Sequence, residues 1–250
     1  MAALLGAELQ RLLARRLVRV LALLAAVSIV IAGVAVFATN ENGEFELTNL
    51  VGIFKGTSGL LVILVSLVGA SFAGADWQSE VMRTTLTWEP RRVRLMLAKA
   101  LACSAVCALG VLVAQSLLGM ALVPAATWRG TTAGADADWL GTLVATSLRI
   151  TALAAVVAAL SFALAMIGRR TSVVMAAGFL YLAVVESAIR SLFDHPEPWL
   201  FGDNAGVLVE GHSHVGIEGR SPLEAALFLS ACAAVALVVA AAWFRARDVS

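Results

Sequence analysis

Six long apolar runs alternate with shorter polar segments along the chain. The runs cover residues 17–37, 58–75, 95–123, 140–167, 171–192 and 223–244. A helix needs about 20 apolar residues to cross a bilayer, and each run approaches or exceeds that length. Because lipid offers no partners for backbone N–H and C=O groups, a helix is the practical way to cross it. The pattern predicts an all-α integral membrane protein with six transmembrane helices.

A shorter amphipathic pattern precedes the first run. Four leucines recur at helical spacing on one face: Leu5, Leu9, Leu12 and Leu13. Charged side chains occupy another face: Glu8, Arg11 and Arg15. An amphipathic helix with basic residues lies naturally in a membrane interface. We therefore expect residues 1–16 to form an interfacial helix, although a plain basic flank of the first span would carry the same charges.

The composition agrees with this pattern. The chain has 250 residues, of which 60% are hydrophobic and 14% are charged. Soluble domains have about 45–50% apolar and about 25% charged residues. The formal net charge is only +1, which gives no reason to expect nucleic acid as a partner. We therefore expect residues 1–250 to form a single transmembrane domain surrounded by membrane lipid.

Lysine and arginine are distributed unevenly between the two sides of the predicted membrane. If the N-terminus is inside, 13 of these residues lie in inner segments: Arg11, Arg15, Arg16, Arg19, Arg83, Arg91, Arg92, Arg94, Lys99, Arg169, Arg170, Arg245 and Arg247. The outer loops then hold only Lys55, Arg129 and Arg220. Cytoplasmic loops carry an excess of basic residues. The asymmetry predicts a multi-pass protein of the cell (plasma) membrane with both termini in the cytoplasm.

Residues 76–90 form a charged segment between the second and third runs. Asp76 is placed to cap a short helix, and Pro90 is placed to end it. Three further residues fall near one face of that helix: Val81, Thr85 and Trp88. A short helix in the first cytoplasmic loop would continue into two spans, so a force applied to it would move both. The simpler alternative is a charged connection that only fixes topology.

The order of residues in and after this segment resembles the first cytoplasmic loop of the permeases of ABC-2 type ABC exporters. That loop has an acidic residue followed by leucine, proline, arginine and lysine. The matching positions here are Asp76, Leu86, Pro90, Arg92 and Lys99. Two positions differ, since Asp76 stands where Glu is usual and Glu80 stands where Gly is common. The resemblance extends over the whole chain through an interfacial helix, six spans and a long loop before the last span.

The resemblance implies a translocation subunit without catalytic residues or a cofactor of its own. The chain contains no G-x-x-x-x-G-K-[ST] motif and no Gly-Lys dipeptide, so it cannot hold nucleotide phosphates by that route. ATP and Mg would be bound by two copies of a partner ATP-binding cassette subunit. A second permease subunit would complete the transporter, with a homodimer as the simpler of two pairings. The cargo would be an amphipathic small molecule, a peptide antibiotic or a lipid-like molecule, and the chain would not be an enzyme.

The resemblance also assigns roles to two segments. The ATPase would dock on a coupling helix and its flanks, which contain Asp76, Trp77, Glu80, Arg83, Thr84, Trp88, Pro90 and Arg92. The last outer loop, residues 193–222, would fold back as short re-entrant helices, as in type V exporters. Within it, Trp199–Phe201 would enter the membrane, and Asp203 or Asn204 would cap a short helix.

Three charged residues lie inside the predicted spans: Arg149, Glu186 and Arg190. Such residues are costly in lipid and are candidates for function. Glu186 and Arg190 are four residues apart on one helix and can pair. Arg149 and Glu186 have similar depths in neighbouring spans, so we expect them to make contact, either as a structural pair or as a polar lining of the transport path. Gln115 is a further intramembrane polar candidate.

Two other classes of protein are alternatives. An ion-gradient-driven secondary transporter could use Arg149 and Glu186, although no pair of spans in corresponding halves is interrupted by Pro or Gly. An intramembrane protease would need nucleophiles or ligands at membrane depth, but the three histidines, His195, His212 and His214, fall in the last outer loop. His212 and His214 form a His-x-His pattern that could bind zinc or copper. Solvated side chains explain it more simply, so no metal site is expected.

Overall fold

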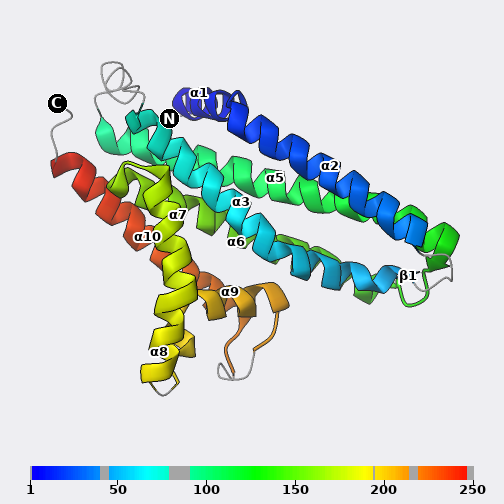
Figure 1. The fold of residues 1–250 in the computed structure, drawn as a ribbon. Helices are drawn as coiled ribbons and strands as arrows, with labels where there is room; N and C mark the ends of the chain where they lie inside the picture. The colour runs from blue at the N-terminus through cyan, green and yellow to red at the C-terminus, as the bar shows by residue number, and fades with distance from the viewer. Residues whose placement is uncertain (1, 40–44, 79–90, 194, 214–218, 247–250) are drawn as a thin grey trace.

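The computed structural model of the chain describes residues 2–39, 45–78, 91–193, 195–213 and 219–246. Within these residues, six helical stretches are long and apolar enough to cross a membrane: α2 Arg16–Thr39, α3 Leu50–Gln78, α5 Arg92–Arg129, α6 Ala137–Gly168, the continuous stretch Thr171–Leu192, and α10 Pro222–Ala246 (Figure 1). We call them spans one to six in that order. The prediction of six spanning helices is confirmed by length and composition.

The other elements are short. Span five is built from α7 Thr171–Leu180, the π-helical η2 Tyr181–Val185 and α8 Glu186–Leu192. The helix α1 Ala2–Leu13 precedes span one. The remaining segments lie in loops: β1 Phe45–Glu46, η1 Leu47–Asn49, β2 Gly130–Thr131, η3 Glu197–Trp199 and α9 Phe201–Glu210.

Span two begins earlier than its apolar pattern predicts. The predicted run covers residues 58–75, whereas α3 covers Leu50–Gln78. Polar residues weaken the apolar signal of the first turns, but the helix satisfies them locally. Thr57 Oγ1 donates to the carbonyl oxygen of Ile53 at 3.0 Å, and Ser58 Oγ donates to that of Lys55 at 2.6 Å. Lys55 therefore lies inside a spanning helix and not in the preceding loop.

The helix α6 lies at the centre of the bundle, where it packs against α3, α5 and α10. Its most apolar stretch is 56% buried within the chain, whereas that of α2 is 6% buried. Small residues allow α3 and α6 to approach closely. A Cβ at Gly69 would lie 2.7 Å from the carbonyl oxygen of Ala158. The core therefore consists of spans two, three, four and six.

Spans one and five lie at the margins of this core. In span five, α7 packs against α3 and α6, while η2 and α8 diverge from these helices (Figure 1). Large apolar side chains of both marginal spans are exposed, among them Leu24, Val27, Ile31, Phe179, Val184 and Leu192. Exposed apolar faces of this extent contact lipid or another subunit in a membrane protein.

The two ends of the bundle are closed differently. α1 and the C-terminal part of α10 lie at one end, which we call the α1 end (Figure 1). At the opposite end of α5, β1 and β2 pair in parallel, with Phe45 opposite Gly130 and Glu46 opposite Thr131. A Cβ at Gly130 would collide with the carbonyl oxygen of Phe45. The fold is otherwise helical, as predicted, and this two-residue ladder ties the loop after span one to the loop after span three.

Candidate functional site

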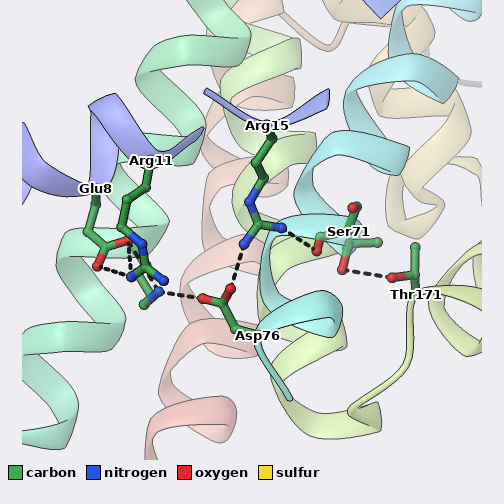
Figure 2. A network of polar contacts seen from close by, with 8 residues as sticks. Glu8, Arg11, Arg15, Ser71, Asp76 and Thr171 are labelled. Atoms are coloured by element: carbon green, nitrogen blue, oxygen red, sulfur yellow. Dashed lines mark hydrogen bonds and ion pairs between the residues drawn. The ribbon is translucent and has the colours of Figure 1, made fainter. Parts of the chain in front are cut away.

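Five charged side chains meet at the α1 end of the bundle (Figure 2). Glu8 and Arg11 lie on α1, and Arg15 lies just after it. Asp76 lies in the last turn of α3, and Lys99 lies in the second turn of α5. We call these five residues the α1 cluster. They bring together three helices that are far apart in the sequence.

The contacts of the α1 cluster form a chain of alternating charge. Asp76 binds Arg15 Nη2 through Oδ1 at 2.5 Å and Lys99 Nζ through Oδ2 at 2.5 Å. Lys99 Nζ also lies 3.2 Å from Glu8 Oε2, and Arg11 Nη1 lies 3.1 Å from Glu8 Oε1. Each carboxylate therefore contacts two cations, and Lys99 joins the two carboxylates.

Most of the α1 cluster is buried. Glu8, Asp76 and Lys99 are each at most 2% exposed. A buried charge is costly unless it is paired and hydrogen-bonded. Removing Asp76 would leave Arg15 without a carboxylate of the cluster, and removing Glu8 would do the same to Arg11, while Lys99 would keep one of its two partners.

The buried ring of Phe72 adds to the same unit. The Arg15 guanidinium lies 4.7 Å and the Lys99 ammonium 5.2 Å from its ring centroid. Cations at such distances are attracted to the face of an aromatic ring. Arg15 Nη1 also donates a hydrogen bond to the carbonyl oxygen of Ser71 at 3.1 Å (Figure 2). The cations of the cluster are therefore held from α3 by a ring and a carbonyl as well as by a carboxylate.

The face of α1 that is buried in the structure differs from the apolar face that the sequence pattern predicts. Leu12 is completely buried, as expected, but Leu13 is 55% exposed. Glu8 was expected on the polar face, yet it lies four residues before Leu12 and shares its buried face. Lys99 explains this difference, because its ammonium neutralises Glu8 inside the packing of α1 against α5.

A second group of contacts joins the neighbouring helix ends. The rings of Trp77 and Phe244 meet edge to face with centroids 5.8 Å apart. The Arg169 guanidinium lies 4.4 Å from the Trp77 ring centroid, and Arg92 lies 5.9 Å from that of Phe244. Arg92 Nη1 also donates to the carbonyl oxygen of Phe244 at 3.3 Å. This aromatic stack connects the ends of α3, α5, α6 and α10.

The predicted docking residues have different outcomes. Asp76 does not begin a new helix, because α3 continues to Gln78. Its carboxylate points to Arg15 and Lys99, so its predicted role as a helix cap is wrong. Trp77 and Arg92 belong to the aromatic stack. The other predicted docking residues, Glu80, Arg83, Thr84, Trp88 and Pro90, lie outside the described residues, and so does the predicted coupling helix.

Glu186 is buried in span five and reaches a neighbouring helix. Its Oε1 accepts a hydrogen bond from the backbone N–H of Gly202 at 2.8 Å, in the first turn of α9. The predicted pair with Arg190 is present at 3.7 Å, while Arg190 binds Asp203 more closely, at 2.6 Å. Glu186 therefore satisfies an N-terminal N–H of α9, a role that the sequence suggested for Asp203 or Asn204. The Asn204 amide instead donates to the carbonyl oxygens of Pro198 and Leu200.

The predicted contact between Arg149 and Glu186 is wrong. The Arg149 guanidinium lies against Gly211, at the C-terminal end of α9, where an added Cβ would collide with it. Glu186 lies against Gly202, at the opposite end of the same helix. Nine residues of helix separate these positions by about 13 Å. The sequence allowed the depth of the two charges in the membrane to be estimated. It did not show that a helix would lie between them.

Gln115 connects span three to span four by a hydrogen bond. It is 1% exposed, and Ser147 Oγ donates to its Oε1 at 2.7 Å. Its side-chain amide nitrogen has no partner within the described residues. Because Gln115 faces α6, it is a packing contact between core helices.

The structure describes only one of the two histidines in the His-x-His pattern. His212 is exposed, and its Nε2 lies 3.9 Å from Glu210 Oε2. His214 lies outside the described residues. Among the residues that the structure describes, no three His, Cys, Asp or Glu side chains group as they would around a metal ion.

No protein-family model matches the chain, and no curated protein matches it. The resemblance to ABC-2 permeases therefore depends on the residues of the chain itself.

Sequence reasoning missed the link from Glu8 through Lys99 to Asp76. The sequence places Lys99 among the basic residues of the inner segments, whereas in the structure it is 1% exposed. A signal was available, because Lys99 lies within the apolar run 95–123, and a charge at such a position requires a partner. The sequence offered several carboxylates and could not indicate which of them folds against it.

Proposed function

We propose that the chain is the membrane-spanning half of an ATP-driven exporter of the ABC-2 type. The order of Asp76, Leu86, Pro90, Arg92 and Lys99 supports this assignment, together with six spanning helices and a helix before the first of them. The chain lacks a phosphate-binding loop motif, so ATP and Mg would be bound by a separate ATP-binding cassette subunit, present in two copies. A second copy of this chain would complete the transporter.

The main support for the proposal is that the residues flanking 79–90 on both sides are joined by ion pairs. The segment leaves α3 after Gln78 and returns before Arg92. Asp76 lies three residues before its start, and Lys99 lies nine residues after its end. These two side chains bind each other at 2.5 Å, and Lys99 also binds Glu8 of α1, while Asp76 binds Arg15 just after α1. A force applied to residues 79–90 would therefore move α1, α3 and α5 together, which is what a subunit driven by a separate motor requires.

The same end of the bundle is the proposed cytoplasmic side. α1 and the last turn of α10, which contains the basic residue Arg245, lie at this end. Arg15, Arg92 and Arg169 also lie there, in the α1 cluster and the aromatic stack. Basic residues of short loops remain on the cytoplasmic side. On this proposal both termini lie in the cytoplasm, α1 lies in the membrane interface, and α9 faces the outer side as part of a re-entrant segment.

The proposed cargo is an amphipathic small molecule, a peptide antibiotic or a lipid-like molecule. The exposed apolar faces of α2 and span five leave room for lipid and for a second copy of the chain. The cargo class follows from the family resemblance alone, and its test is transport by the reconstituted complex.

Copurification from native membranes tests the proposal. A tagged wild-type chain should retain an ATPase subunit that hydrolyses ATP, and Trp88→Ala should reduce its recovery at least tenfold at matched expression. Glu46→Ala is the matched control, because Glu46 is exposed and lies at the opposite end of the bundle. Asp76 is unsuitable here, since its removal disturbs the α1 cluster.

Two results would refute the proposal. One is the absence of any ATPase subunit from the purified wild-type complex. The other is cargo movement that continues without ATP and stops when an ionophore collapses the ion gradient. That second result would favour a secondary transporter, in which Glu186 and Arg149 would be the first residues to test.

A further inference from the structure

The helix α9 occupies the space between the diverging part of span five and the core. Its residues Val207, Leu208 and Val209 are buried, and it packs against α10 and α6. On the other side lies α8, which diverges from α3 and α6 (Figure 1). The contacts of α9 with its surroundings therefore determine where the second half of span five lies relative to the core.

The N-terminal end of α9 is held by span five. Glu186 accepts the backbone N–H of Gly202 at 2.8 Å, and Arg190 binds Asp203 at 2.6 Å. A Cβ at Gly202 would lie 2.5 Å from Glu186 Oε2, so the absence of a side chain makes room for the carboxylate. Glu186 directly follows the π-helical turn Tyr181–Val185. A π turn inserts an extra residue into a helix and so changes the face on which the next residues lie.

The C-terminal end of α9 is held by spans two and four. Lys55 Nζ lies 2.8 Å from Glu210 Oε2 and donates to the Glu210 carbonyl oxygen at 3.2 Å. Gly211 ends the helix with a φ of 82°, a conformation that favours glycine. The Arg149 guanidinium occupies the position that a side chain at Gly211 would take.

The charges at both ends match the dipole of the helix. Backbone N–H groups give the N-terminus partial positive charge, and carbonyl groups give the C-terminus partial negative charge. The carboxylate of Glu186 lies at the N-terminus of α9, and the cations of Lys55 and Arg149 lie at its C-terminus. Each end is thus held by a charge of the favourable sign, and the two sets of charges come from different spans.

We infer that α9 is a strap that couples the second half of span five to the core, with Glu186 and Gly202 as its release point. Breaking the contacts at either end frees α8 to move against spans two and four. The strap is a conformational device of this fold, and it holds whether or not the chain proves to be an exporter.

Hydrogen–deuterium exchange of the full chain in lipid nanodiscs tests the strap. The peptides to follow cover residues 201–211 and 186–193. Glu186→Ala and Gly202→Ala should each increase exchange in both peptides about tenfold. Glu186→Gln, which retains an acceptor for the Gly202 N–H, should have a smaller effect. Glu46→Gln removes an exposed carboxylate far from α9 and should leave both peptides unchanged.

Variants at the far end of α9 separate a strap from a local helix cap. Lys55→Met and Arg149→Met remove cations that lie at the C-terminal end of α9, yet the strap predicts increased exchange in 186–193 as well as in 201–211. Unchanged exchange of 186–193 in these variants would overturn the inference, because α9 would then respond alone. An equal response of both peptides to Glu46→Gln would also overturn it, because the changes would then reflect general destabilisation.

Discussion

The α1 cluster and the α9 strap use the same kind of interaction in different surroundings. In the α1 cluster the side chains of Glu8, Asp76 and Lys99 are 1–3% exposed. At the strap, Glu186 is also buried, with its side chain 4% exposed, but the cations Lys55 and Arg190 that pair there are 23% and 45% exposed. Breaking a buried pair costs about 3–5 kcal/mol, whereas an exposed pair contributes about 0–1 kcal/mol. The charges at the α1 end therefore fix the helices, and those around α9 position a helix that apolar contacts already hold.

This difference matters for the proposed exporter, in which the α1 end would transmit a movement. A rigid base at the α1 end would pass displacement of residues 79–90 to three helices at once. Weak contacts at the strap could be exchanged without unfolding the core. The apolar packing of Val207, Leu208 and Val209 against α10 and α6 limits how far α9 moves when its end contacts change.

The largest effect is expected for Asp76→Ala. The substitution leaves Lys99 and Arg15 near Phe72 without their shared carboxylate, so the free energy of unfolding should fall by about 3–5 kcal/mol. Unfolding in mixed detergent micelles, followed by circular dichroism, measures the change. Glu46→Ala serves as the control, because Glu46 is exposed and should lose less than about 1 kcal/mol. Equal losses in the two variants would contradict a buried structural role for Asp76.

A small effect is expected for Lys55→Met. Lys55 and Glu210 are both partly exposed, so the free energy of unfolding should change by about 0–1 kcal/mol. Salt should reduce this difference further, since solvent screens exposed pairs. The same measurement at 0.1 M and about 0.5 M NaCl tests this, with Asp76→Ala as the salt-insensitive comparison. A loss of unfolding free energy above about 3 kcal/mol would mean that the Lys55–Glu210 contact is a major source of the stability of the fold.

The spans could be predicted from the sequence because long apolar runs have few alternatives in lipid. The bounds were less certain where polar residues lie inside a helix, as at Lys55, Thr57 and Ser58. Thr57 and Ser58 are satisfied by local hydrogen bonds that composition does not reveal, and Lys55 is satisfied by the distant residue Glu210. The predicted contact of Glu186 with Arg190 was local and is present.

The candidate site was harder to predict because its contacts join residues far apart in the chain. The Asp76–Lys99 and Glu8–Lys99 pairs depend on how α1, α3 and α5 pack, which a single sequence does not specify. The expected Arg149–Glu186 contact shows the same limit, because α9 inserts between two charges of similar depth. A charged residue inside an apolar run indicates that the fold must supply a partner for it. The sequence does not show which residue that partner is.

Double-mutant cycles compare the two kinds of contact most directly. One cycle combines Asp76→Ala with Lys99→Ala, and the other combines Lys55→Ala with Glu210→Ala, both by unfolding in the same micelles. The difference in burial predicts a coupling energy of about 3 kcal/mol or more for Asp76 and Lys99. It predicts less than about 1 kcal/mol for Lys55 and Glu210. Equal couplings, or a larger coupling for Lys55 and Glu210, would contradict the view that the α1 end is fixed by buried charge and the α9 strap is not.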